Sequence, residues 1–307
     1  MNRKPMSVWL MAALAVVATI AAACGSTPTT GGSTPNKGKL TVAGFNFPES
    51  SILAYVYGKA LEHDGYTVTY KVNLGTREVV APALKSGQID LYPGYAATDL
   101  EYWDQSKGLA TGDVTATATQ LNQYLSQNQL IALTPSAAVD QNAFAMTKAN
   151  SQKYNATKLS DLASIGNQLV LGAGPECPTR PYCQPGLKST YGITFKDFKP
   201  LDTDGPLTRA AFANGTIQVG LVFSSDGDLN AKGLVVLQDD KHLEAADNVV
   251  PIMRQAAATD EVKTLLNNID AKLTTADLVT MNSQVSIQHQ DPDAVAAAYL
   301  QQHNYFS

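Results

Sequence analysis

The sequence predicts an α/β protein built as two lobes, and three observations support this prediction. Short apolar runs alternate with amphipathic stretches from Lys39 onward, which is typical of βαβ units around a parallel sheet. A second series of the same kind begins at Gln168. The chain has 307 residues, and because domains commonly hold about 100 to 150 residues, one compact sheet would leave too much chain over.

The first series contains three expected strands and two expected helices. YTVTYKVNL places β-branched and aromatic residues at alternate positions, as a strand does. Gly65 and Gly87 end the two stretches whose apolar residues fall on one helical face. In chain order we expect a strand over 40–45, a helix over 48–63, a strand over 66–74, a helix over 78–87 and a strand over 89–92.

The second series repeats the pattern before a helical C-terminal part. QLVLGAG and IQVGLVF read as buried strands, with PLTRAAFANG as a helix between them. We expect strands over 168–174, 217–223 and 234–240, a helix over 206–215, and mostly helix from residue 259. Crossovers near Pro135 and Leu234 would divide the chain into lobe I (residues 39–137 plus 235–307) and lobe II (residues 138–234).

Two tyrosines lie at the end of the strand expected over 89–92, in the stretch IDLYPGY. Ligands of parallel sheets gather in the crevice at the carboxyl ends of the strands. Tyr95 is therefore expected in a cleft. Tyr92 is expected to pack within its lobe, because alternate side chains of a strand point to opposite faces.

The N-terminus has the pattern of an export signal. Arg3 and Lys4 precede an apolar run of 16 residues that ends in small residues before Cys24. A transmembrane anchor is the alternative, but the run is shorter than the roughly 20 residues that cross a bilayer. We expect a signal peptide over 1–23, a lipidated Cys24 that anchors the exported protein to the outer face of the cell membrane, and a flexible Gly, Ser, Thr and Pro tether over 24–38.

The two remaining cysteines lie six residues apart in ECPTRPYCQPG. With Cys24 assigned to lipid, Cys177 and Cys183 can close one small disulfide loop in an oxidising compartment. A zinc half-site is the alternative, but neither this spacing nor the four scattered histidines supplies a ligand set. We expect the disulfide and no metal.

Charge and motifs argue against several other functions. The net charge is −5 and no basic run is present, which argues against nucleic acid as a partner. The chain contains no GxGxxG after a strand, no GxxxxGK[ST] and no GxSxG. The acid pair Asp239 and Asp240 reads as surface charge at a strand end. We therefore expect neither an enzyme nor a cofactor.

A series of blocks points to a known family. These blocks are FNFPESSILA, NLGTREVVAPALKSGQIDLYPGYAATDL, ATKLSDL, RPYCQPGLKSTYGITF, SSDGDL and VVLQDDKH. In order and spacing they resemble the substrate-binding lipoproteins of osmoprotectant ABC transporters of the glycine betaine, choline and carnitine type. The resemblance implies a type II periplasmic-binding-protein-like fold, with a hinge and a cleft between the lobes. It also implies a monomer that captures a small solute and delivers it to an ABC permease.

The resemblance further implies which residues hold the solute. A quaternary ammonium cation has no N–H to donate, so it is held by aromatic faces. Tyr95, Phe144 and Phe223 would form the cage, and Arg180 would grip a ligand carboxylate. The residues that the resemblance places at the cleft are Asn46, Glu49, Tyr95, Thr98, Asn142, Phe144, Arg180, Phe223 and Asp247.

Departures from the family pattern leave a second interpretation open. Phe45 stands where the family often has lysine, Gly94 where it has glutamate, and Asp247 at or near the place of a further cage tyrosine. Considered alone, Phe144 and Phe223 would be core residues. The alternative is therefore a binding protein of the same fold for a different solute, either uncharged or aromatic.

Overall fold

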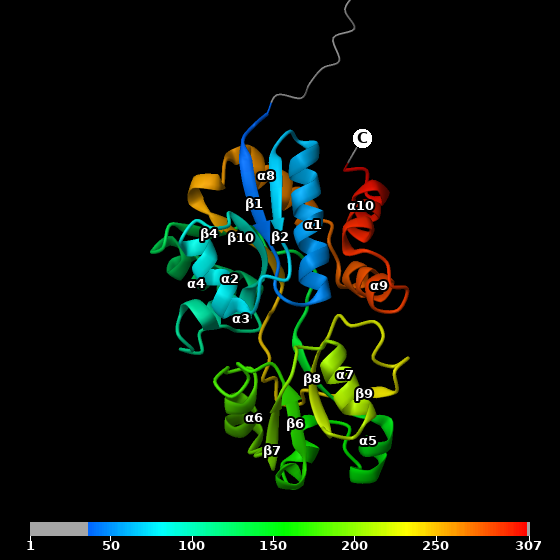
Figure 1. Ribbon diagram of the computed structural model, residues 1–307. Helices are drawn as coiled ribbons and strands as arrows, with labels where there is room; N and C mark the ends of the chain where they lie inside the picture. The colour runs from blue at the N-terminus through cyan, green and yellow to red at the C-terminus, as the bar shows by residue number, and fades with distance from the viewer. Residues whose placement is uncertain (1–35, 306–307) are drawn as a thin grey trace, which may run out of the picture. The chain divides into compact units, whose positions relative to one another are not determined.

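The computed structural model describes residues 36–305, which form two lobes that each contain a five-stranded sheet (Figure 1). The predicted two-lobed α/β architecture is confirmed. The expected signal peptide, Cys24 and most of the tether lie outside the described residues. Among residues 36–305, no helix combines the length and apolar character needed to cross a membrane.

Lobe I contains the first sheet and most of the helices. Its strands lie in the order β2 (Thr67–Lys71), β1 (Lys39–Ala43), β3 (Leu91–Tyr95), β10 (Val249–Arg254) and β4 (Leu130–Ala132). Its helices are α1 (Pro48–His63), α2 (Arg77–Lys85), α3 (Ala96–Trp103), α4 (Val114–Ser126), α8 (Asp260–Asp270), α9 (Thr275–Ser286) and α10 (Pro292–Gln302). Helix α1 begins with a proline at its first turn, buries its apolar face, and packs against α8, α9 and α10.

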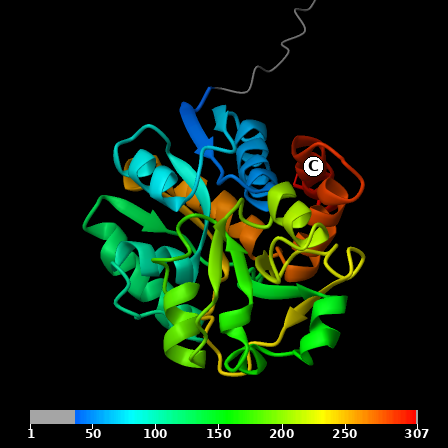
Figure 2. The ribbon, with the colours of Figure 1, turned by 60° about the horizontal axis from the view of Figure 1, so that its bottom comes forward.

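Lobe II contains the second sheet, with strands in the order β7 (Asp197–Pro200), β6 (Val170–Ala173), β8 (Val219–Phe223), β5 (Asn142–Thr147) and β9 (Leu234–Leu237). Its helices are α5 (Lys148–Tyr154), α6 (Gln184–Tyr191) and α7 (Pro206–Ala213). Figure 2, in which lobe II lies in front, shows its strands and helices as a unit next to lobe I. The predicted strand over 234–240 forms as β9.

The alternating pattern predicted parallel sheets, but both sheets are mixed. Strand β10 runs antiparallel to both of its neighbours, and so does β5. Each of these strands follows a crossing from the other lobe. The chain therefore enters the sheet at the edge where the neighbouring strands end, and must run in the opposite direction.

The expected return to lobe I near Leu234 is wrong. Strand β9 pairs with β5 in the second sheet, and Leu243 still packs on the core of lobe II. Lobe II thus extends to residue 244. The chain first passes from one sheet to the other between β4 and β5, the segment that contains Pro135.

The two crossing segments, residues 133–141 and 245–248, are hydrogen-bonded to each other. The backbone N–H of Asp140 donates to the carbonyl of Asp247 over 3.1 Å. Val139 and Asn248 form an antiparallel bridge, and the N–H of Val249 donates to the carbonyl of Ala138 over 3.0 Å. The lobes are therefore joined by a two-stranded ribbon rather than by two independent linkers.

The core of lobe I contains one ionisable pair that should make stability depend on pH. The Tyr57 hydroxyl donates to the Asp270 carboxylate over 2.7 Å, and both side chains are buried. Burial raises the pKa of Asp270 well above its usual value, although the Tyr57 hydrogen bond opposes the rise. The folded protein therefore holds this proton more tightly than the unfolded chain does.

Asp270→Asn is expected to raise the free energy of unfolding at neutral pH. Above the unfolded pKa of about 4, folding must retain a proton that the unfolded chain releases, at about 1.4 kcal/mol for each unit between the two pKa values. The gain should be small near pH 4 and should grow as the pH rises. Urea unfolding of both proteins at pH 4.5 and pH 8 checks this. An equal difference at both pH values would contradict it.

Candidate functional site

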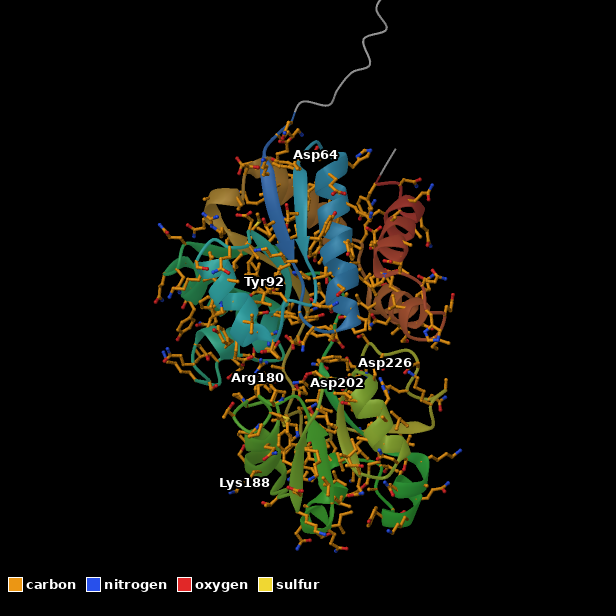
Figure 3. The ribbon with its side chains drawn as sticks, viewed as in Figure 1. Asp64, Tyr92, Arg180, Lys188, Asp202 and Asp226 are labelled. Atoms are coloured by element: carbon orange, nitrogen blue, oxygen red, sulfur yellow. A yellow bond between two sulfur atoms is a disulfide. The ribbon has the colours of Figure 1, made fainter. Side chains whose placement is uncertain are left out.

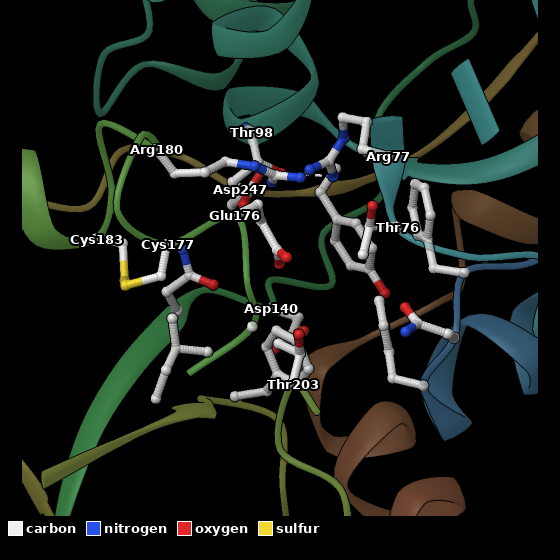
Figure 4. A pocket seen from close by; sticks show the side chains of 18 residues that line it. Thr76, Arg77, Thr98, Asp140, Glu176, Cys177, Arg180, Cys183, Thr203 and Asp247 are labelled. Atoms are coloured by element: carbon white, nitrogen blue, oxygen red, sulfur yellow. Dashed lines mark hydrogen bonds between the residues drawn. A yellow bond between two sulfur atoms is a disulfide. The ribbon is translucent and has the colours of Figure 1, made fainter. Parts of the chain in front are cut away.

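A cavity of about 70 Å³ lies between the lobes, where the β3 end of lobe I faces strands β5, β6 and β8 of lobe II (Figure 4). This is room for roughly five water molecules, so it suits a small solute. Seven of the nine predicted residues line it, namely Asn46, Tyr95, Thr98, Asn142, Arg180, Phe223 and Asp247. Glu49 and Phe144 do not.

Four aromatic rings cluster at the cavity. Phe45, Phe47 and Tyr95 come from lobe I, and Phe223 comes from the end of β8 in lobe II. Ring centroids lie 6.4 Å apart for Phe45 and Tyr95, 6.1 Å for Phe47 and Tyr95, and 4.9 Å for Phe47 and Phe223. The Phe47–Phe223 pair joins the two lobes directly. The arrangement presents apolar ring surface from both sides, which is what a cation without N–H groups requires.

Glu49 lies behind the aromatic cluster and connects the lobes. It accepts hydrogen bonds from the Tyr95 hydroxyl over 2.7 Å, from Ser225 Oγ of lobe II over 2.5 Å, and from Asn282 Nδ2 over 2.6 Å. Burial raises the pKa of Glu49, and these hydrogen bonds act against the rise. Glu49 was predicted to lie at the cleft. It does not line the cavity, and instead orients Tyr95 through their hydrogen bond.

Three acidic side chains line the cavity. Asp247 accepts the backbone N–H groups of Ala97 and Thr98 at the start of α3, over 2.9 and 3.0 Å, and its burial raises its pKa to about 7. Asp140 accepts the N–H of Ser225 over 3.1 Å, and burial raises its pKa well above the usual value. Glu176 has one buried carboxylate oxygen with no hydrogen-bond partner within the described part of the chain.

Two arginines also reach the cavity, and each has an acidic partner. Arg77 Nε lies 2.9 Å from Asp99 Oδ1, and this pair is almost fully buried. Arg180 donates through Nε and Nη2 to both carboxylate oxygens of Glu78, over 2.9 to 3.1 Å. Figure 3 shows Arg180 on the side of lobe II that faces lobe I, so this second pair bridges the lobes.

Phe144 is a core residue, so its predicted place in the cage is wrong. It lies opposite Leu221 and Leu237 in the middle of the second sheet and packs in the same cluster as Cys177 and Cys183. Asn142, two residues earlier on the same face of β5, is at the cavity instead. Two residues along a strand move a side chain roughly 6.6 Å away from the cleft edge.

The predicted disulfide between Cys177 and Cys183 is present, with a Cα–Cα distance of 5.2 Å. Both cysteines are buried and are among the residues that line the cavity. The loop that they close carries Arg180, and Glu176 precedes it directly. The disulfide therefore holds two charged groups of the cavity in place.

Several residues of the cavity were not predicted from the sequence: Phe47, Thr76, Arg77, Asp140, Glu176 and Thr203. Most follow the carboxyl end of a strand, as Tyr95 does. Phe47 follows β1, Thr76 and Arg77 follow β2, and Glu176 follows β6. The same rule, applied to every expected strand, would have found them. Asp140 lies on a crossing segment, and this position is the only feature of the sequence that could have indicated it.

Comparison with known proteins gives a consistent result. Residues 38–302 match the family described as the substrate binding domain of the ABC-type glycine betaine transport system. The glycine betaine-binding protein YehZ of Escherichia coli (strain K12) is 26% identical over 265 residues, which cover 83% of this chain and 87% of that protein. The carnitine transport binding protein OpuCC of Listeria monocytogenes is 27% identical over 304 residues, with 92% and 91% covered.

A solved structure has the same fold. The crystal structure of a glycine betaine/carnitine/choline ABC transporter protein superimposes with a TM-score of 0.65 at 24% identity, over 87% of this chain and 100% of that one. At this identity the likeness concerns the fold, which is the two-lobed architecture described above.

Proposed function

Because the chain belongs to the family of substrate-binding domains of ABC-type glycine betaine transport systems, we propose that it captures a small quaternary ammonium solute, of the betaine, choline or carnitine class, for import. The lobes close on the solute, and the closed protein delivers it to the permease of an ABC transporter. The observation that carries this proposal is the aromatic cluster from both lobes around one small cavity.

The physical basis is the match between the cavity and a cation that cannot donate hydrogen bonds. Ring faces attract such a cation with about 0.5–2 kcal/mol each when water is excluded. The acidic side chains of Asp140, Glu176 and Asp247 lie close to the rings, and a bound cation would favour the ionised forms of Asp140 and Asp247. An uncharged solute lacks the charge that these three acidic groups attract, so the cation is favoured over this alternative.

We also propose that the protein acts outside the cytoplasm as a monomer, anchored through a lipid on Cys24. The export pattern of residues 1–23 and the small residues before Cys24 support the anchor. The disulfide supports an oxidising compartment.

Titration of the purified protein with choline, glycine betaine, carnitine and a panel of uncharged aromatic compounds tests the proposed solute class. Isothermal calorimetry should detect saturable binding of at least one of the three quaternary ammonium compounds. Binding of aromatic compounds alone would overturn the proposal in favour of a different solute.

Tyr95→Ala is expected to weaken binding of a quaternary ammonium ligand by about 1–2 kcal/mol, the scale of a desolvated cation–π contact. This is a loss of roughly 5- to 30-fold in affinity. Tyr95→Phe is the matched control, because it keeps the ring and removes only the hydroxyl that donates to Glu49. Calorimetry should rank the affinities as wild type, then Phe, then Ala. Unchanged affinity of the alanine variant would show that Tyr95 only packs.

A further inference from the structure

Glu78 is hydrogen-bonded to Arg180, the positively charged side chain that a ligand carboxylate would need. Arg180 is the cavity arginine that the resemblance assigns to a ligand carboxylate. In the structure Nε and Nη2 of Arg180 both donate to Glu78. Nη2 lies 2.9 Å from each carboxylate oxygen, and Nε lies 3.1 Å from one of them. Such forked arginine–carboxylate pairs are the stronger and more directional kind of ion pair.

Glu78 also takes a second donor. The hydroxyl of Thr76, another cavity residue, donates to Glu78 Oε2 over 2.7 Å. Burial acts to raise the pKa of Glu78, but Arg180 and Thr76 together lower it, so Glu78 stays ionised and holds both groups. A ligand carboxylate that binds Nε and Nη2 of Arg180, or the Thr76 hydroxyl, would have to displace Glu78 from them.

The second cavity arginine is no substitute. Arg77 donates to Asp99 through Nε and to Thr98 Oγ1 through Nη2, each over 2.9 Å. Its partner Asp99 is fully buried, so moving Arg77 to a ligand would leave a buried carboxylate without a cation. This costs far more than a ligand contact returns.

With both arginines paired, the ionisable side chains that remain at the cavity are acidic. Asp140, Glu176 and Asp247 line it, and none of the ion pairs among the described residues includes them. A cation without a carboxylate gains from these three groups, because its charge favours the ionised forms of Asp140 and Asp247, whose pKa values burial raises. A zwitterion gains for its ammonium end, but its carboxylate end meets acidic side chains and an Arg180 whose Nε and Nη2 are already bound to Glu78.

We propose that Glu78 is a specificity-determining residue, which makes the cleft select cations such as choline over zwitterions such as glycine betaine by holding Arg180. This rests on the proposed function, because both ligands belong to the proposed solute class. It goes beyond that function because it states which of the two ligands binds more tightly. Arg180 then acts as part of an inter-lobe contact and not as a carboxylate receptor.

Calorimetric titration of the wild type with choline and with glycine betaine is the first arm of the test. We expect choline to bind at least tenfold more tightly. If neither ligand binds, this inference fails, and the proposed function fails with it only when carnitine does not bind either. If both bind and betaine is equal or tighter, only the assignment of specificity to Glu78 fails.

The second arm changes the residue itself. Glu78→Gln keeps an acceptor for Thr76 but removes the charge that holds Arg180, so betaine affinity should rise and the choline preference should fall at least threefold. Adding Arg180→Ala to this variant should cancel the gain in betaine affinity, because the gain depends on the freed guanidinium. Glu62→Gln, an exposed glutamate on α1, is the matched control and should leave the preference unchanged. An unchanged preference in Glu78→Gln, or a betaine gain that survives loss of Arg180, overturns the proposal.

Discussion

Asp99→Ala is expected to lower the free energy of unfolding by about 3–5 kcal/mol, the usual result of leaving one buried charge without its partner. Asp99 is fully buried and accepts hydrogen bonds from Arg77 Nε over 2.9 Å, from the Tyr92 hydroxyl over 2.8 Å and from the Tyr95 N–H over 2.8 Å. The alanine variant therefore leaves a buried guanidinium without its carboxylate and two further donors without an acceptor.

The same variant should also weaken ligand binding, because Asp99 fixes the backbone of Tyr95 at the cavity. The matched control is the double variant Arg77→Met/Asp99→Leu, which replaces both charges with apolar groups. Buried ion pairs exchanged as a whole often cost little, so the double variant should be more stable than Asp99→Ala. Urea unfolding at pH 7 provides the comparison. A loss below about 1 kcal/mol in Asp99→Ala would show that the pair is solvated.

The packing around Asp99 also explains the glycine at position 94, where the family pattern has glutamate. A Cβ atom at Gly94 would lie 2.5 Å from Ile252 Cδ1 and 2.7 Å from Asp99 Oδ2. Atoms cannot approach so closely, and both neighbours are buried in the core. The packing of β3 against β10 therefore requires glycine at this position.

Cys177→Ala/Cys183→Ala is expected to cost about 2 kcal/mol of unfolding free energy, the amount that the chain-entropy model gives for so short a loop. Alanine avoids burying two hydroxyl groups in the lobe II core. Ligand affinity should fall as well, because the loop carries Arg180 and adjoins Glu176, and both need a fixed position to shape the cavity.

Reduction of the wild-type disulfide gives an independent check on this prediction. Wild-type protein treated with a phosphine reductant should approach the double variant in both unfolding midpoint and affinity, whereas the double variant should not respond to the reductant. If the variant matches untreated wild type in both properties, the loop is held by its packing alone.

Part of the site follows from local rules and part does not. The rule that ligands gather at the carboxyl ends of strands places Tyr95 correctly, and the family resemblance adds Thr98 and Phe223. Phe144 was misplaced because a resemblance aligns residues along a strand but does not give their depth below the cleft edge. Its pairing with Leu221 and Leu237 decides that depth.

Contacts between distant parts of the sequence were beyond these rules. Arg180 and Glu78 are 102 residues apart, and nothing in either segment indicates that they meet. The same holds for β9, whose sequence predicts a strand but not the sheet that it joins. Pairing with β5 assigns it to lobe II.

The two-stranded ribbon between the lobes has a consequence for the order of events in capture. A paired ribbon bends across its plane more easily than its strands slide along each other. We therefore expect the lobes to rotate about the ribbon as a hinge. Asp140 and Asp247 belong to this ribbon, and the distance between them should hardly change as the lobes rotate. An arriving cation would therefore meet these two acidic side chains first, before the rings close over it.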